Sequence, residues 1–153
     1  MKLLSAIPTL DTDAYTAGDA CGELLTFDVG PSRTCVIKKA EVLDDGASPV
    51  SAAMVLHIFN DGALAVADDA AFSVTQANFT AGKYIGSIAI GSSDYADTPL
   101  GDNASAKLAS IADVDMFVPT VQGKFYGQLV CTGTPTFAAA DELAVLLHVA
   151  EYA

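Results

Sequence analysis

Short apolar runs of strand length recur along the whole chain, and turn-forming residues separate them. Gly tolerates positive φ, Pro fixes φ, and Asp, Asn and Ser bond to the nearby backbone, so clusters of these residues mark turns. The two-residue alternation inside the runs is typical of strands. The segments predicted to be strands are 24–30, 34–43, 52–59, 83–90, 115–120, 124–132 and 142–152.

Segment 142–152 is apolar at almost every position, so its periodicity allows a helix or a strand. Its Val, Leu and Tyr content and the turn-rich residues before it favour a strand paired with 124–132. Only 68–79 and 103–113 have helical patterns, and both are short. We therefore expect an all-β fold, an antiparallel β-sandwich of the jelly-roll or Greek-key type with about seven or eight strands and one or two short helices.

Two of the predicted strands carry informative face patterns. In 34–43 the side chains of Cys35, Ile37, Lys39 and Glu41 alternate with those of Val36, Lys38, Ala40 and Val42. After Lys124, neither face of the predicted strand 124–132 is charged, with Phe125, Gly127, Leu129 and Cys131 on one face and Tyr126, Gln128, Val130 and Thr132 on the other. One face of this strand packs on the core. The second face needs a cover, either from a loop or the N-terminal segment of the same chain or from another protein.

Segment 9–27 is too polar and turn-rich to form a core strand before Leu24. We expect 1–23 to be an extended N-terminal arm with Leu10 and Tyr15 as candidate anchors, followed by a single sandwich domain over 24–153. A frayed terminus is the alternative. Pro8 ends the first apolar run too early for a signal peptide, so synthesis in a cytoplasm is expected.

The charge of the chain is strongly acidic, with 7 Lys and Arg against 19 Asp and Glu and a formal net charge of −12. Nucleic-acid binding depends on basic side chains that displace counterions from phosphates, so we expect no nucleic-acid partner. Anionic membranes are disfavoured for the same reason, and no apolar segment is long enough to span a bilayer, so no membrane association is expected. Arg33 is the only arginine, which leaves the chain poorly equipped to clamp an anionic substrate.

The three cysteines, Cys21, Cys35 and Cys131, are an odd number without metal-binding or redox spacing. Three reduced thiols, mostly buried, are the favoured interpretation. A Cys21–Cys35 bridge remains open.

Candidate chemistry is sparse. His57 and His148 lie inside apolar runs without any HxH or HExxH spacing, so each is interpreted as a neutral side chain on a sheet. The acid pairs are interpreted as turn residues or helix caps rather than calcium ligands, and they are Asp11/Asp13, Asp44/Asp45, Asp68/Asp69 and Asp113/Asp115.

Nucleophile and phosphate-binding motifs are also missing from the sequence. The lack of Trp weakens glycosidase and lectin hypotheses, because sugar-binding clefts commonly use aromatic platforms. We predict no catalytic residue, no cofactor-binding residue, no metal ligand and no cofactor, and we expect that the protein is not an enzyme. A small hydrolase built on the carboxylates and the two histidines is the weakest alternative.

Three stretches carry a resemblance that extends, in order, over nearly the whole chain. They are LDTDAYTAGD at 10–19, DDAAF at 68–72 and the hairpin pattern YGQLV…GTPT at 126–136. Their order resembles a family of small virion proteins of tailed phages, commonly encoded beside the major capsid protein. Cys21 and Cys131 are departures from that pattern. The resemblance implies a virion structural component, most simply a head-decoration or cement protein.

From this resemblance we expect the protein on the surface of the phage head, bound to the major capsid protein and self-associated as a dimer or trimer. Parts of 1–23 and the loops 44–50 and 91–103 are expected to contribute to binding. The alternatives are a virion adhesin or carbohydrate-binding module, with a cluster around Tyr84, Asp94 and Tyr95, or a tail or baseplate component.

Overall fold

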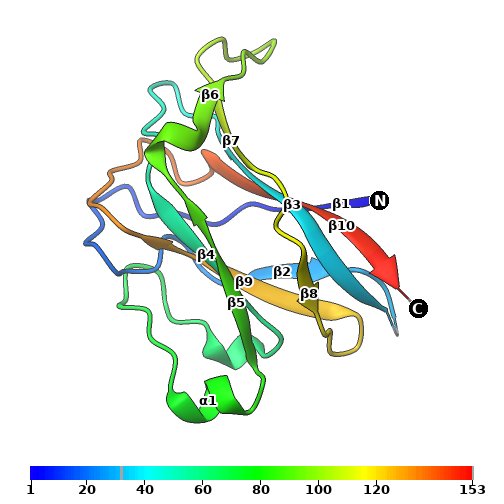
Figure 1. Ribbon diagram of the computed structural model, residues 1–153. Coiled ribbons are helices and arrows are strands. Elements are labelled where there is room, and N and C mark those ends of the chain that lie inside the picture. The colour runs from blue at the N-terminus through cyan, green and yellow to red at the C-terminus, as the bar shows by residue number, and fades with distance from the viewer. Residues whose placement is uncertain (32, 153) are drawn as a thin grey trace.

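The computed structural model describes residues 1–31 and 33–152 and confirms an antiparallel all-β sandwich of two sheets (Figure 1). The larger sheet has the strand order β1-β10-β3-β7-β6, with β8 also paired to β3. Its strands are β1 (Lys2–Ala6), β3 (Thr34–Asp44), β6 (Tyr95–Asp97), β7 (Lys107–Ile111), β8 (Met116–Val118) and β10 (Leu143–Tyr152). The smaller sheet has the order β2-β9-β4-β5, formed by β2 (Leu25–Asp28), β4 (Met54–Phe59), β5 (Tyr84–Ile90) and β9 (Lys124–Cys131).

Each of the seven predicted strands overlaps an observed one, but the expected pairing of 142–152 with 124–132 is wrong. β10 pairs with β3 and β1 in the larger sheet, whereas β9 pairs with β2 and β4 in the smaller one. The connection 132–142 is longer than the roughly two to five residues of a tight hairpin. It crosses between the sheets with Phe137 buried beneath it, which separates the two strands.

The helix predictions are wrong over most of their length. In 68–79 only the end is helical, in α1 (Gln76–Thr80), and Ala71 forms a bridge with Asp19. Segment 103–113 contains β7, which pairs with β3, so tertiary pairing overrides a weak local preference. Two single-turn 3₁₀ helices complete the elements, η1 (Gly62–Leu64) and η2 (Ser92–Asp94). None of the helices among the described residues is long and apolar enough to cross a membrane.

The core lies between the sheets and follows the strand alternation, except at one point in β3. Cys35, Ile37, Ala40 and Val42 all point inward and are buried. The register between β3 and β10 shifts beside His148, so that one extra residue of β3 is accommodated there. Such a bulge changes which side chains face the core, and it explains why a strict alternation over 34–43 is wrong.

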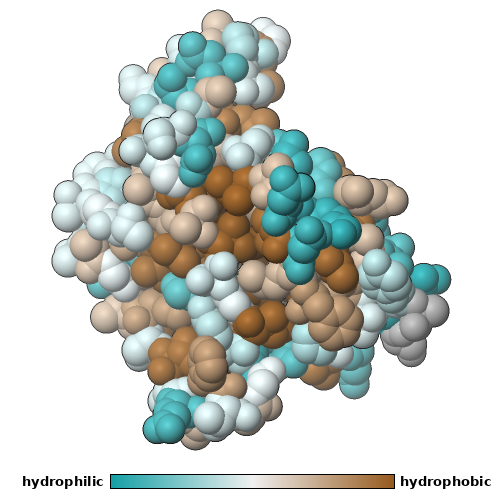
Figure 2. Space-filling model, viewed as in Figure 1, coloured by the Kyte–Doolittle hydropathy of each residue, from teal (hydrophilic) through white to brown (hydrophobic). Residues whose placement is uncertain are grey.

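One side of the sandwich is closed by side chains rather than by strand pairing. Figure 2 shows an apolar band over β5 and toward β8. Ile85, Val114 and Met116 are half-buried there and pack on the core. A Cβ atom on Gly86 would lie 3.0 Å from Met116 Cε, so the methionine packs directly on the glycine of β5.

The N-terminal residues, expected to form a separate extended arm, are built into the sandwich. β1 pairs with β10 along its whole length, from Lys2 opposite Val149 to Ala6 opposite Val145. Leu10 and Tyr15, the candidate anchors, are both buried.

The second face of β9 is covered by the same chain. Gln128, on this face, is fully buried, and its Nε2 donates to the carbonyls of Gly22 (3.1 Å) and Val66 (2.7 Å). The N–H of Val66 donates to Gln128 Oε1 at 3.0 Å. One amide therefore ties two covering segments, 18–22 and 60–72, to the outside of the smaller sheet. Figure 1 shows the excursion that contains α1 on the side of this sheet that faces away from β10.

The expectation of three reduced thiols is wrong for Cys21 and Cys131. Segment 18–21 runs beside the end of β9, where the N–H of Cys21 donates to the carbonyl of Leu129 at 2.8 Å. This brings Cys21 and Cys131 to a Cα–Cα distance of 6.1 Å, and they form a disulfide. Cys35 is a free buried thiol, and burial raises its pKa to about 11.

We predict that Gln128→Leu lowers the free energy of unfolding by about 2–3 kcal/mol, because it leaves backbone groups of Gly22 and Val66 buried without partners. Gln76→Leu, at an exposed position of α1, is the matched control and should change stability by less than about 0.5 kcal/mol. Urea unfolding measures both. Equal stability of the two variants would contradict the role given to Gln128.

Candidate functional site

Parts of the segments 44–50 and 91–103, which are expected to contribute to binding, lie side by side at one end of the sandwich. Loop 45–53 joins β3 to β4, and loop 98–106 joins β6 to β7. Asn103 Nδ2 donates to the carbonyl of Asp45 (2.9 Å), to its Oδ1 (2.9 Å) and to the carbonyl of Gly46 (3.0 Å). We refer to these two loops together as the loop end.

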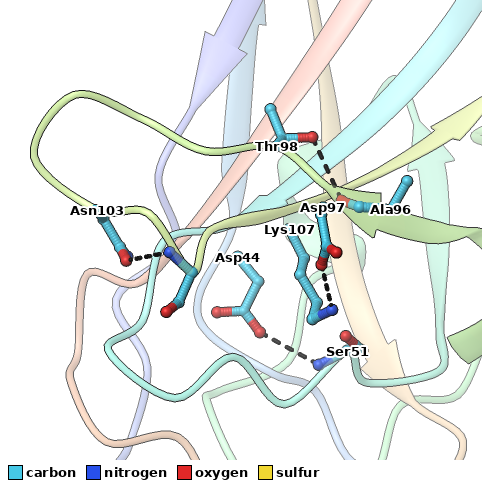
Figure 3. Close-up of polar contacts among 8 residues, drawn as sticks. Asp44, Ser51, Ala96, Asp97, Thr98, Asn103 and Lys107 are labelled. Carbon is cyan, nitrogen blue, oxygen red and sulfur yellow. Dashed lines mark hydrogen bonds and ion pairs between the residues drawn. The ribbon is translucent and has the colours of Figure 1, made fainter.

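A hollow of about 500 Å³ lies between the two loops. The hollow is lined by small or rigid side chains and by one ion pair. The lining residues are Ala47, Ser48, Pro49, Asp97, Pro99, Ala104, Ser105 and Lys107. Lys107 Nζ lies 2.7 Å from Asp97 Oδ1 (Figure 3), and this hydrogen bond lowers the pKa of the Asp97 carboxyl. Because Asp97 is highly exposed, the pair contributes little to stability and is available to a partner.

The path of loop 45–53 is fixed from below by Asp44. This side chain is fully buried, and its carboxylate accepts hydrogen bonds from the N–H groups of Gly46 (3.2 Å), Val50 (2.8 Å) and Ser51 (3.3 Å). Figure 3 shows the bond to Ser51. Ser51 has a φ of 52°, in the left-handed region that is costly for a residue with a side chain. The contacts to Asp44 hold this conformation in place.

Glu142 is a second buried acid that packs against loop 45–53. Only 3% of its surface is exposed, and its Oε1 accepts from the N–H of Ala138 at 2.7 Å. Its Oε2 is buried without a hydrogen-bond partner and lies against Gly46, where a Cβ atom would collide with it. Burial and the neighbouring charge of Asp44 raise the pKa of Glu142. The raised pKa favours the protonated form of Glu142, whose hydroxyl can donate a hydrogen bond that a carboxylate cannot.

This pair gives stability a defined pH dependence. The folded protein binds the Glu142 proton more tightly than the unfolded chain does. The stabilisation is complete below the ordinary glutamate pKa, and it is lost as the pH rises through the higher pKa of the folded state. We predict that Glu142→Gln, whose amide can donate to Asp44 at any pH, raises Tm at pH 8 by about 2–4 °C.

The matched control is Asp141→Asn, since Asp141 is the exposed neighbour of Glu142. Thermal unfolding from pH 4 to pH 8 should show a gain for Glu142→Gln that grows with pH and no such trend for Asp141→Asn. A loss of stability in Glu142→Gln at pH 8 would contradict the raised pKa of Glu142.

The structure places the two histidines on different sheets. His57, on β4, bonds through Nδ1 to Tyr84 Oη at 2.8 Å and stacks on Phe72 with ring centroids 4.4 Å apart; burial lowers its pKa and favours the neutral form. His148, on β10, lies with Nε2 2.5 Å from Glu41 Oε1. In the part of the chain that the structure describes, no three His, Cys, Asp or Glu side chains gather as metal ligands.

The residues suggested for carbohydrate binding do not form one site. Tyr84 begins β5, and Tyr95 follows the far end of that strand. Tyr95 Oη donates to the carbonyl of Ala52 at 3.0 Å, and Asp94 Oδ2 accepts from the N–H of Gly91 at 2.7 Å. The side chains of Asp94 and Tyr95 are therefore both engaged in hydrogen bonds within the chain.

The three stretches that carry the family resemblance meet around Tyr15, which is 1% exposed. Its hydroxyl donates to Asp68 Oδ1 (2.8 Å), and its N–H donates to the carbonyl of Pro135 (2.9 Å). Its ring packs edge-on against Phe137, with centroids 6.0 Å apart. Segments 10–19, 68–72 and 126–136 thus form one structural junction.

The support of the loop end is the feature that the sequence did not reveal. Nothing in the pattern indicates that Asp44 and Glu142 meet, because they flank strands far apart in the chain. The only local signal is that each acid directly adjoins an apolar strand, where a solvated carboxylate is not expected. Comparisons with known proteins found no matching family model, no matching curated protein and no matching solved structure.

Proposed function

We propose that this chain is a phage virion structural protein, a decoration or cement protein that binds the outer surface of the capsid lattice and stabilises the head. The observation that carries the proposal is the resemblance of segments 10–19, 68–72 and 126–136 to small virion proteins encoded near the major capsid protein. Their convergence on Tyr15 supports it, since the three stretches then specify one structural unit. On this proposal the protein acts by binding and catalyses no reaction.

The loop end is the surface that we assign to the capsid. Asn103 joins its two loops, and Asp44 and Glu142 support loop 45–53 from within. A surface that is ordered before binding loses little conformational entropy on binding. The hollow between the loops can receive a protruding side chain of the major capsid protein, and the Asp97–Lys107 pair offers both charges at its rim.

Many weak contacts suffice for such a role. A capsid presents the same site many times, so linked copies of the protein bind the lattice more strongly than one copy does. The acidic remainder of the surface keeps the coated particle soluble and separates particles by like charge.

The test is binding to purified expanded capsids that lack the protein. We predict that wild-type protein sediments with these capsids and raises the temperature at which they release their DNA. Ala104→Arg, which fills the hollow, should weaken capsid binding by about 10-fold or more. Ala81→Arg, at the exposed end of α1, is the matched control and should bind as wild type does.

Capsids that are unchanged by saturating wild-type protein would contradict the cement function. Equal binding by the two variants would contradict the loop end as the contact surface. Labelled antibodies on intact virions separate a head protein from a tail or baseplate component.

A further inference from the structure

Covering segment 18–22 is attached to β9 in two different ways, by backbone hydrogen bonds and by a covalent bond. The N–H of Cys131 donates to the carbonyl of Asp19 at 2.9 Å, and the N–H of Gly18 donates to the carbonyl of Cys131 at 2.8 Å. The disulfide then joins Cys21 to Cys131, which lie 110 positions apart in the chain. The hydrogen bonds form under any redox conditions, whereas the disulfide forms only where an oxidant is present.

The hydrogen bonds are sufficient to place the two cysteines next to each other. Ala20 forms an isolated bridge with Val130, and the N–H of Cys21 donates to the carbonyl of Leu129 at 2.8 Å. None of these contacts involves a sulfur atom, so the reduced chain can make all of them. The covering segment therefore packs on β9 before the disulfide exists, and the disulfide then fixes an arrangement that is already formed.

Both cysteines are closed off from solvent while the segment lies on β9. Cys21 and Cys131 are each 0% exposed, and the neighbouring Ala20 is equally buried. Thiol–disulfide exchange requires direct attack of a thiolate on a sulfur atom, so neither an oxidant nor a reductant reacts until segment 18–22 lifts from the sheet. In the reduced protein only non-covalent contacts oppose this local opening. In the oxidised protein the disulfide itself prevents it.

We infer that segment 18–22 and the Cys21–Cys131 pair form a redox-dependent lock on the cover of the smaller sheet, which a small disulfide closes readily and a thiol reductant opens only slowly. Oxidised glutathione represents this class of oxidant. One cysteine thiolate attacks it and releases a glutathione thiolate, and the second cysteine thiolate attacks the mixed disulfide and releases the other. The two electrons reduce glutathione disulfide, and the two cysteine protons pass to the two glutathione thiolates.

The third cysteine does not compete for this bond. Cys35 lies on β3 of the larger sheet and is 0% exposed. Burial raises the pKa of its thiol to about 11, so that very little of the reactive thiolate forms near neutral pH. The lock therefore uses one specific pair of cysteines, and Cys35 provides an internal reference for the reactivity of a thiol in the core.

The test compares the full-length protein in its reduced form and after oxidation with glutathione disulfide. It needs no capsid, so its outcome is independent of the proposed function. Once unfolded in urea, the oxidised chain should show one thiol reactive with iodoacetamide and the reduced chain three. Oxidation should raise Tm by roughly 10 °C, because the bond closes a long loop of the unfolded chain.

Two rates test the asymmetry of the lock. In the folded reduced protein, Cys21 and Cys131 should react with iodoacetamide at least about 10-fold faster than Cys35, because the covering segment opens locally and the core does not. Dithiothreitol should reduce the folded oxidised protein at least about 100-fold more slowly than the protein unfolded in urea, because the bond blocks the local opening.

Cys35→Ala is the matched control for Cys21→Ala. Cys35→Ala should keep the gain in Tm on oxidation, and Cys21→Ala should lose it. The comparison is between two redox conditions of one variant, so a lower intrinsic stability of either variant does not affect it. Three free thiols after saturating glutathione disulfide, an unchanged Tm, or a gain that Cys21→Ala retains would overturn the inference. So would equal labelling of all three thiols, or reduction of the folded protein at the rate of the unfolded chain.

Discussion

The buried amide of Gln128 is the interaction on which the arrangement of this molecule depends. After Lys124, strand β9 has apolar or neutral side chains on both faces, so the sandwich can form only if something shields its outer face from water. Gln128 binds Gly22 and Val66 at once, and thereby fastens the N-terminal segment and the long excursion after β4 over the smaller sheet. A buried polar group with all its partners present both stabilises a packing and specifies it, because any displaced arrangement leaves the group unpaired.

Because of this cover, the outer face of the smaller sheet is buried under its own chain, and the outer face of the larger sheet is not. The smaller sheet is closed by its own chain, with the Cys21–Cys131 bridge and the Tyr15 junction fixing the cover in place. On the larger sheet, Lys39 and His148 bond to the carboxylate of Glu41, which is 8% exposed. The loop end, held by Asp44 and Glu142, is a third surface of fixed shape. The proposed function assigns the contact with the shell to the loop end.

Much of the fold could be predicted from the sequence because strand alternation is local. The seven apolar runs all contain strands, and the fold class follows from them. The errors come from information that is not local. β7 is a strand because β3 lies beside it, and the phase of β3 changes because of a bulge opposite β10. Cys21 lies close to Cys131 because segment 18–21 runs alongside the end of β9. Segments 44–50 and 91–103 could be proposed as contact regions at the sequence level, but the Asp44–Glu142 pair beneath the loop end depends on the sheet that brings β3 and β10 together.

Electron cryomicroscopy of capsids reconstituted with the protein tests the central claim most directly. The account predicts density for the sandwich on the outer surface of the head, with loops 45–53 and 98–106 facing the shell. Density confined to the tail, density in which the loop end faces away from the shell, or bare capsids after saturation would contradict it.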